Sequence, residues 1–350
     1  MRLGDKQAGF TLVELMVSIV LGLLIVAAAT QLFISGQASL NLQRALAEIQ
    51  DNGNFGLNYL LQDIRKSNLD AVQAVINDQN LYGGLVLTGL ASYGASDVDT
   101  DDKKKAITAN LPYTLTATNV PKTLMTRGAG QTAGSGNVWT GVTNVAGTAG
   151  DNSSIDKSDQ LVIQYKAAEA GTMDCQGNTI SQTEIDNGTY IVQRYFLRKD
   201  GTNNNDLALA CDAGRYTTAT ATAPTTITDY GDAGEIIMRR VDHFHVLLGV
   251  KENNTDEFRY MSIKDYMGTG ANDLAASAVA RPRLMSIQIG LLVRAADQTK
   301  DNLVTSTQTY NILDQNVGLT DTAKGSGKYI RQVITQTIAL RNGYGLTEAL

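Results

Sequence analysis

The residues best placed for chemistry lie near the N-terminus, where one carboxylate interrupts a long apolar run. Glu14 is the only formal charge between Phe10 and Thr30. The run is 21 residues long, and as an α-helix it would cover ~30 Å, the thickness of a bilayer's hydrocarbon core. A bare carboxylate in lipid is costly, so Glu14 needs a cationic partner. A cut after Gly9 would supply one, because it leaves a positively charged amine on Phe10.

This spacing suggests how copies of the chain associate. The Phe10 amine of one subunit and Glu14 of its neighbour could pair inside an apolar assembly. Gly9 and Phe10 are therefore the candidate processing residues, and Phe10 and Glu14 the candidate assembly residues. Arg2 and Lys6 precede the apolar run, which places that side in the cytoplasm and exports the rest.

The N-terminal pattern resembles the class III signal of type IV pilins and type II secretion pseudopilins. The matching elements are the basic leader, Gly9 before the cut, Phe10 as first mature residue, and Glu14. The resemblance implies that a prepilin peptidase removes residues 1–9 and N-methylates Phe10. A secretory signal fits less well, because its cleavage site would follow the apolar region. An ordinary signal anchor carrying one glutamate is the other alternative.

Length and charge limit the class of protein. The chain has 350 residues and a formal net charge of −6, or about −7 without the leader. No long basic stripe is present, so we expect no nucleic-acid partner. Beyond the helix described next, about 280 residues remain, enough for one large or two small globular units.

Apolar residues continue at helical spacing past the membrane run. They are Leu42, Leu46, Ile49, Leu57, Leu60 and Ile64, with Gly53 in the gap. We predict one helix over 10–68, transmembrane over 10–30 and amphipathic over 31–68. Gly and Asn should weaken it near 51–54. The amphipathic half should pack on a sheet.

Strand patterns recur from residue 160 onward. They cover 161–166, 190–199, 236–250, 257–263, 284–294 and 328–341. Alternation with one apolar face in the last two indicates an antiparallel sheet packed against the amphipathic helix. We therefore predict an α+β, pilin-like fold with a periplasmic, β-rich head over 69–350. A Gly- and Thr-rich stretch predicts a large irregular insertion over about 88–158.

The two cysteines, Cys175 and Cys211, lie in polar, turn-rich sequence. In an oxidising compartment they are expected to form one disulfide, worth roughly 3–4 kcal/mol in the chain-entropy model. Two free thiols are the alternative. A catalytic cysteine is less favoured, since neither has a histidine nearby in sequence.

Other polar clusters have simple explanations. The acidic run 97–102 resembles a calcium loop, but Asp102 and Thr108 stand where such a loop needs Gly and Glu, and three lysines follow. His243 and His245 have a spacing that can serve a metal, but without further ligands they are expected to be half-buried sheet residues. Trp139 is either a local anchor for the insertion or a partner contact.

No catalytic triad order, phosphate loop or zinc signature is present. We therefore predict no catalytic residue, metal site or cofactor, and a protein that is not an enzyme.

The C-terminal two-thirds resembles the PilW family of minor pilins. The resemblance rests on 241–250, 283–294 and 329–342, and on the helix end at 51–57 and 63–65. One departure is that the Gly-Cys often found after the helix in this family is missing from 67–70. The absence of a proline near Gln31 favours a minor pilin or pseudopilin over a major pilin.

The resemblance implies a protein that primes type IV pilus assembly within a tip-located minor pilin complex. Its implied partners are other minor pilins, the major pilin, the inner-membrane assembly platform and the prepilin peptidase, with a PilY-type tip adhesin also compatible. The implied location is the inner membrane, as a single-pass protein, and then the pilus tip. Neighbours are expected to contact the seam around Leu42–Ile64. The alternatives are a type II secretion pseudopilin of the J kind and a membrane-anchored periplasmic enzyme.

Overall fold

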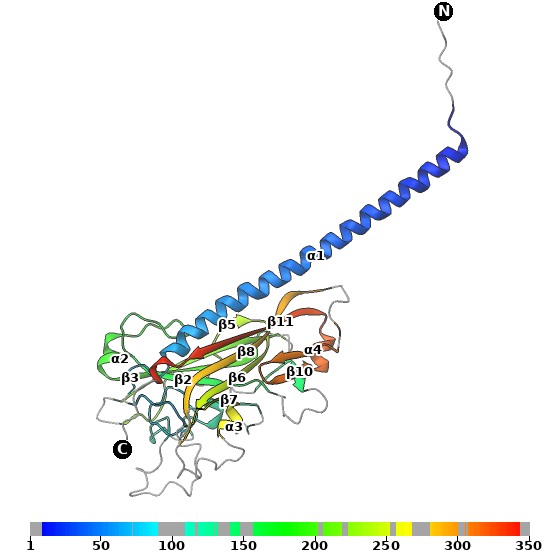
Figure 1. Cartoon of the computed structure of the whole chain (residues 1–350). Helices are drawn as coiled ribbons and strands as arrows, with labels where there is room; N and C mark the ends of the chain where they lie inside the picture. Colours follow the sequence, from blue (N-terminus) through cyan, green and yellow to red (C-terminus); the bar gives the residue numbers. More distant parts are fainter. Residues whose placement is uncertain are drawn as a thin grey trace, which may run out of the picture.

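The fold consists of one long helix and a β-rich head (Figure 1). It is a computed structural model that describes residues 9–71, 73–89, 109–115, 118–129, 131, 141–147, 157–201, 206–218, 223–252, 257–267, 281–299, 305 and 307–343. The N-terminal half of α1 (Leu12–Lys66) stands clear of the head, and its C-terminal half lies along the head (Figure 1).

Helix α1 begins and ends with clear local signals. Thr11 is its N-cap, and Arg65 and Lys66 in its last turn suit the negative end of the helix dipole. The helix ends at Lys66 with Ser67 as its C-cap, and Asn68, just beyond, has a left-handed φ of 63°. The weakening predicted near 51–54 is not seen, because α1 is continuous over 55 residues.

Two four-stranded antiparallel sheets form most of the head. The first has the order β2 (Leu161–Lys166), β3 (Thr189–Lys199), β4 (Leu207–Thr217) and β5 (Glu235–Arg239). The second has the order β11 (Tyr329–Ala339), β8 (Arg283–Gln298), β6 (Val241–Lys251) and β7 (Phe258–Ser262). The predicted α+β class is therefore confirmed.

Smaller elements complete the head. A three-stranded sheet has the order β1 (Val145–Gly147), β10 (Gln315–Leu319) and β9 (Tyr310–Ile312). The short helices are α2 (Gln182–Asp186), α3 (Ile263–Met267) and α4 (Asp321–Gly325), with 3₁₀ turns η3 (Lys122–Leu124) and η5 (Arg341–Gly343).

The sequence patterns found six strand regions and missed others. The patterns contain no sign of β4, whose Ala, Asp and Gly residues have low strand propensity. Pairing with β3 along its whole length fixes β4 as a strand. The single run predicted over 236–250 is two strands, because Arg240 takes a left-handed φ of 59° between β5 and β6.

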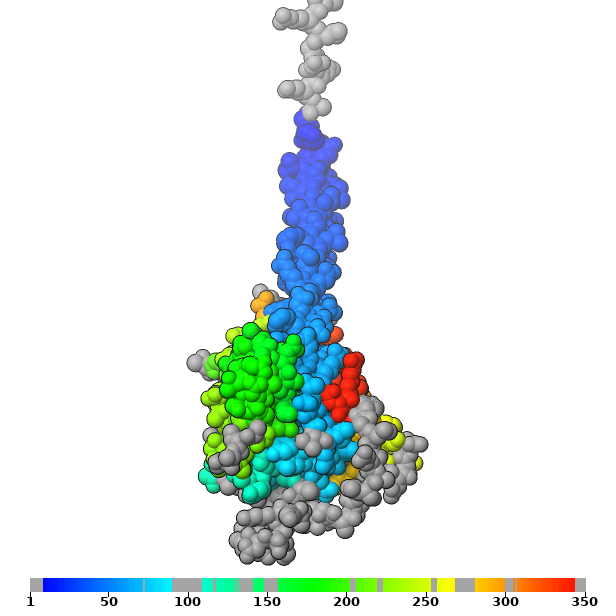
Figure 2. All heavy atoms as spheres, turned by 90° about the vertical axis from the view of Figure 1, so that its left-hand side faces the viewer, coloured from blue at the N-terminus to red at the C-terminus, as the bar shows by residue number. Residues whose placement is uncertain are grey.

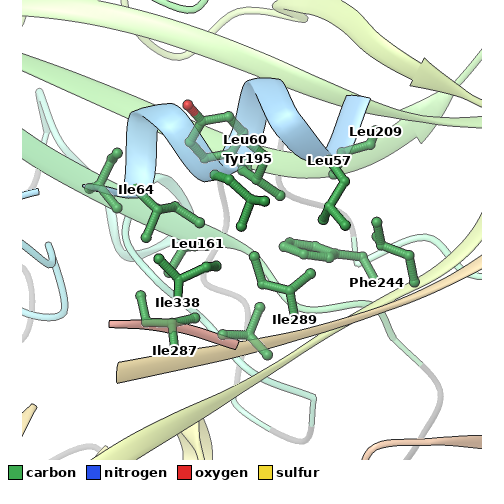
Figure 3. Packing of buried hydrophobic residues seen from close by; sticks show 14 of the residues in the cluster. Leu57, Leu60, Ile64, Leu161, Tyr195, Leu209, Phe244, Ile287, Ile289 and Ile338 are labelled. Atoms are coloured by element: carbon green, nitrogen blue, oxygen red, sulfur yellow. The ribbon is translucent and has the colours of Figure 1, made fainter. Parts of the chain in front are cut away.

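One large core joins α1 to both four-stranded sheets (Figure 3). Its members include Leu57, Leu60 and Ile64 from α1, Leu161, Tyr195 and Leu209 from the first sheet, and Phe244, Ile287, Ile289 and Ile338 from the second. Burying each such side chain contributes about 1.5–3 kcal/mol. The helix thus supplies a layer of the head's own core.

Where the small sheet covers it, the second sheet carries apolar side chains on both faces, which the one-sided alternation did not predict. On the face away from α1, Leu292 and Val333 pack against Tyr310, Ile312 and Val317 of the small sheet. Parts of the predicted insertion form another core, in which Leu111, Leu115, Leu124 and Met125 pack with Val192 of β3. Trp139 and the acidic run 97–102 lie outside the described residues.

Candidate functional site

The residues around Glu14 form a capping box at the start of α1. Both the backbone N and Oγ1 of Thr11 donate to Glu14 Oε2, each at 3.0 Å. Thr11 Oγ1 in turn accepts from the Glu14 backbone N at 3.3 Å. The carboxylate therefore has hydrogen-bond partners within its own chain. Sequence reasoning missed Thr11, although the Thr-x-x-Glu spacing is the signature of a capping box.

The N-terminal half of α1 is a bare apolar rod (Figure 2). Phe10 is 89% exposed, and Leu12, Leu24 and Phe33 are all more than 60% exposed. By length and composition α1 could cross a membrane, and none of its apolar window is buried inside the chain. Exposed apolar surface of this kind marks a membrane or protein contact.

Two glycines let the C-terminal half of α1 approach the head closely. A Cβ on Gly53 would clash with the Cδ1 of Ile334 in β11. A Cβ on Gly56 would lie 2.7 Å from Met238 Cε and 3.1 Å from the Ile237 carbonyl oxygen in β5. The glycines thus serve close packing between helix and sheet, which explains their presence inside a helix despite low propensity.

Polar contacts flank this packing. Glu48 accepts from Arg240 Nη2 at 2.7 Å and from the Ala296 backbone N at 3.3 Å. Near the other end, Tyr195 OH donates to Asp63 Oδ2 at 2.8 Å. Burial, followed by the Asp63 charge, raises the pKa of Tyr195 well above its ordinary value. These groups fix α1 along its axis relative to both sheets.

The end of α1 is fixed by two asparagines. Asn68 Oδ1 accepts from Gly84 N at 2.9 Å, and Asn68 Nδ2 donates to the Asn342 carbonyl oxygen at 3.0 Å. Asn342 Nδ2 donates back to the carbonyl oxygens of Arg65 and Ser67. Side-chain amides here satisfy the free carbonyls of the last helical turn. Nothing in the local sequence pattern links these two distant residues.

The structure shows that the helix seam faces the head rather than a neighbour. Ile49, Leu60 and Ile64 are almost completely buried in the head's own core. The prediction that the amphipathic half packs on a sheet is therefore confirmed, and the prediction that neighbouring subunits contact this seam is wrong for 49–64. The opposite side of α1 is open instead, with Phe55 73% and Tyr59 39% exposed.

Cys175 and Cys211 form a disulfide with a Cα–Cα distance of 6.1 Å. Both cysteines are buried in the main core. Cys175 lies in a turn, as its sequence context suggested, but Cys211 lies in the middle of β4. The sequence around Cys211 therefore gave the wrong local structure. Its small neighbours belong to a strand, and they are buried.

His243 and His245 are completely or almost completely buried, and not half-buried as predicted. His245 Nδ1 lies 2.7 Å from Asp159 Oδ2, and its Nε2 lies 2.7 Å from Asp314 Oδ1. His243 Nε2 lies 3.0 Å from Gln315 Oε1. The cluster joins β6 to the residues before β2 and to the β9–β10 turn.

The chemistry of the pair follows from these contacts. A carboxylate accepts but cannot donate, so two carboxylate partners require both nitrogens of His245 to carry protons. Burial alone would lower the pKa of His245, but Asp159 and Asp314 outweigh it and raise the pKa to about 9. Burial and then the His245 charge lower the pKa of His243 to about 4. His245 is therefore a buried cation and His243 is neutral.

The cluster has a structural rather than a metal-binding geometry. Both nitrogens of His245 are already occupied by carboxylates. Among the described residues, no group of three or more His, Cys, Asp or Glu side chains could hold a metal ion. Val241, two residues before His243 on β6, packs in the main core and not beside the histidines, because the β6–β8 register shifts between Val241 and His243.

Two family models match the chain. The prokaryotic N-terminal methylation motif matches residues 4–30, which contain Gly9, Phe10 and Glu14. The model described as type IV pilus-assembly protein W, PilW, matches residues 194–342, from β3 to η5. Together the two matches support a type IV minor pilin of the PilW family. The first match covers most of the exposed, apolar half of α1. The second covers most of the strands that pack against the C-terminal half of α1.

Further comparisons add little to the PilW assignment. A type IV-like pilin from Thermus thermophilus shares 16% sequence identity, over 58% of this chain and 85% of that chain, with a TM-score of 0.24. No curated protein matches this PilW-family chain.

Proposed function

We propose that this PilW-family protein primes type IV pilus assembly as a member of a minor pilin complex at the pilus tip. The observation that carries the proposal is the bare half of α1, which exposes apolar side chains on every side. Its role in this proposal is structural, without catalysis.

The rod suits transfer from membrane to fibre. Lipid tails and a bundle of apolar helices are similar environments, so the transfer itself involves little hydrophobic driving force. After removal of residues 1–9, the Phe10 amine of a neighbour would approach Glu14, whose carboxylate Thr11 already orients. The amine and the carboxylate would interact strongly in an environment without water. Two apolar helices can pack at several axial offsets, and this ion pair would favour one of them.

The head favours a terminal position. It has about 280 residues, roughly twice a common small domain, and it is built directly around 49–64 of α1. Repeating such a head along a dense fibre would produce clashes, whereas the tip has room. The proposed neighbours in the fibre are other minor pilins and the major pilin. Before assembly, the helix is proposed to span the inner membrane with the head in the periplasm. The assembly platform would act on it, and a PilY-type adhesin is a further proposed tip partner.

The decisive experiment is deletion of the gene in a strain whose pilus retraction is disabled. We expect fewer pili, because initiation is impaired, with an unchanged fibre structure. Immunogold labelling of the wild-type protein should mark fibre ends. An unchanged pilus count, or label spread along the fibre at the density of the major pilin, would contradict the proposal.

Processing is tested separately by mass spectrometry of the N-terminus. Protein from cells with an active prepilin peptidase should begin at a methylated Phe10. Recovery of intact Met1 from such cells would show that the leader is not removed.

A further inference from the structure

The outer face of the β11-β8-β6-β7 sheet is only partly covered by the small sheet. At the covered end, Ile312 and Leu313 lie against Gly290, where a Cβ would be 2.7 Å from Ile312 Cγ2. Further along the same face, Tyr260 and Phe258 of edge strand β7 are 46% and 61% exposed. The β9–β10 hairpin thus ends in a step, beyond which the described residues leave these side chains of the sheet face exposed.

Tyr260 reaches from β7 across β6 on this face. It pairs with Gly249 on β6, which in turn pairs with Ser286 on β8. A Cβ on Gly249 would lie 2.8 Å from Tyr260 Cε1, and Ser286 Oγ donates to Tyr260 OH at 3.2 Å. The ring therefore occupies the space that a side chain at position 249 of β6 would fill, and the hydrogen bond from Ser286 holds its hydroxyl end. Such a ring is preorganised for stacking.

Uncharged polar groups continue the same face. Gln288 follows Ser286 on β8 and donates from Nε2 to Thr337 Oγ1 of β11 at 3.2 Å. Thr337 is exposed, and Ser286 and Gln288 are partly exposed. We call Phe258, Tyr260, Ser286, Gln288 and Thr337 the aromatic shelf. None of these five side chains carries a charge. Two cations border the shelf at one end: Lys251, which pairs with Phe258, and Arg283, which pairs with Lys251.

We propose that the aromatic shelf binds a neutral polysaccharide, a binding activity beyond pilus assembly. A sugar ring has an apolar C–H face, which stacks on an aromatic ring, and hydroxyls at its edge, which bond to amides and hydroxyls. Phe258 and Tyr260 are two residues apart on one strand, so their rings start ~7 Å apart and can contact two sugar units of one chain. Gln288, Ser286 and Thr337 offer the donors and acceptors beside them.

Charge and size favour this ligand over others. A phosphate-bearing or acidic polymer would need cationic side chains among the stacking and hydrogen-bonding groups. The two nearby cations, Lys251 and Arg283, lie together at one end of the shelf, and Arg283 donates to the Gly343 carbonyl oxygen. Four strands ~4.8 Å apart and three rows of residues give a surface of roughly 200 Å². A stable protein interface needs about 800 Å² on each partner. A thin, flat, uncharged chain fits the area and the chemistry best.

The test uses the full chain in detergent with three neutral polysaccharides, insoluble cellulose, insoluble chitin and immobilised galactomannan, and with immobilised anionic alginate as comparison. We expect retention on at least one neutral polymer and not on alginate. The Phe258→Ala/Tyr260→Ala variant should bind at least tenfold more weakly. Both side chains are exposed, so the fold should be unaffected, which thermal unfolding will verify. The control variant is Tyr113→Ala. Tyr113 is a tyrosine outside the shelf that is 58% exposed, and this variant should bind like the wild type.

Each other result overturns the proposal. Wild-type protein that binds none of the three neutral polymers has no such site. Equal binding by the double variant places the sugar elsewhere. Loss of pilus incorporation in the double variant, without sugar binding by the wild type, would make the shelf a subunit interface. Because purified protein is used, failure here leaves the proposed role in assembly untouched, and failure in assembly leaves this test valid.

Discussion

Glu14 combines two tasks that can be separated by mutation. As N3 of the capping box it bonds to Thr11, and as a carboxylate it is proposed to pair with a neighbour's amine. Gln can accept the capping hydrogen bonds but carries no charge. Glu14→Gln therefore tests the charge alone, and Glu14→Ala removes both functions.

We predict that both variants insert into the membrane at least as well as the wild type, since a charge leaves the lipid. Incorporation into pili should fall in both, to a similar degree, as measured by immunoblotting sheared fibres and membrane fractions. Wild-type recovery of Glu14→Gln in fibres would show that capping, and not the ion pair, is what assembly requires.

His245 should make the head sensitive to high pH. Its folded pKa of about 9 lies above the unfolded value of 6.5, so its stabilisation is complete below about 6.5 and is lost as the pH rises through 9. The shift corresponds to roughly 3 kcal/mol. In urea unfolding of detergent-solubilised protein, the stability difference between wild type and His245→Gln should shrink between pH 7 and 10. A constant difference would mean that His245 is not the titrating cation.

His243 should have the opposite effect at low pH. Its pKa is lowered to about 4, so the neutral form stabilises the fold above about 6.5, and this contribution is lost as the pH falls through 4. Relative to His243→Gln, the wild type should lose free energy of unfolding between pH 6.5 and 4. Parallel pH curves for the two proteins would refute the assignment.

The docking of α1 on the sheets depends on the absence of side chains at two helical positions. Ala is a better helix former than Gly by about 1 kcal/mol, but at Gly56 the new Cβ meets Met238 Cβ and the Ile237 carbonyl oxygen, which cannot move freely. Overpacking of this kind costs roughly 1–3 kcal/mol. We predict that Gly56→Ala lowers the melting temperature of the head.

Gly36 supplies the matched control for this prediction. It lies in the same helix with nothing within 4 Å of its Cβ position. Gly36→Ala should therefore leave the melting temperature unchanged or raise it slightly, through helix propensity alone. If both variants behave alike in thermal unfolding, close packing at Gly56 is not what fixes the helix.

The head as a whole is cross-linked by Cys175–Cys211, which closes a loop with a sequence separation of 36 residues. In the chain-entropy model this stabilises the head by roughly 3–4 kcal/mol. The Cys175→Ala/Cys211→Ala variant should lose a comparable free energy in urea unfolding. The wild type under reducing conditions should lose about as much. Labelling of both thiols in native, unreduced protein would show that the bond is absent.

The sequence alone determined the features that depend on local pattern. The apolar run with Glu14, the period of α1, and the alternation in β8 and β11 each follow from neighbours a few residues apart, and the structure contains each of these elements. The even count of cysteines, in a chain expected to be exported, likewise predicted a pair.

Tertiary structure decided what depends on residues far apart in the chain. Strand β4 exists because β3 and β5 pair with it, and Gly56 matters because Met238 stands opposite. His245 is a cation only because Asp159 and Asp314 meet there. The apolar seam of α1 was expected to pack on a sheet, but that two sheets share it depends on residues far apart in the chain. Periodicity identifies an apolar seam but not its partner, because burial energy depends on area and not on which surface supplies it.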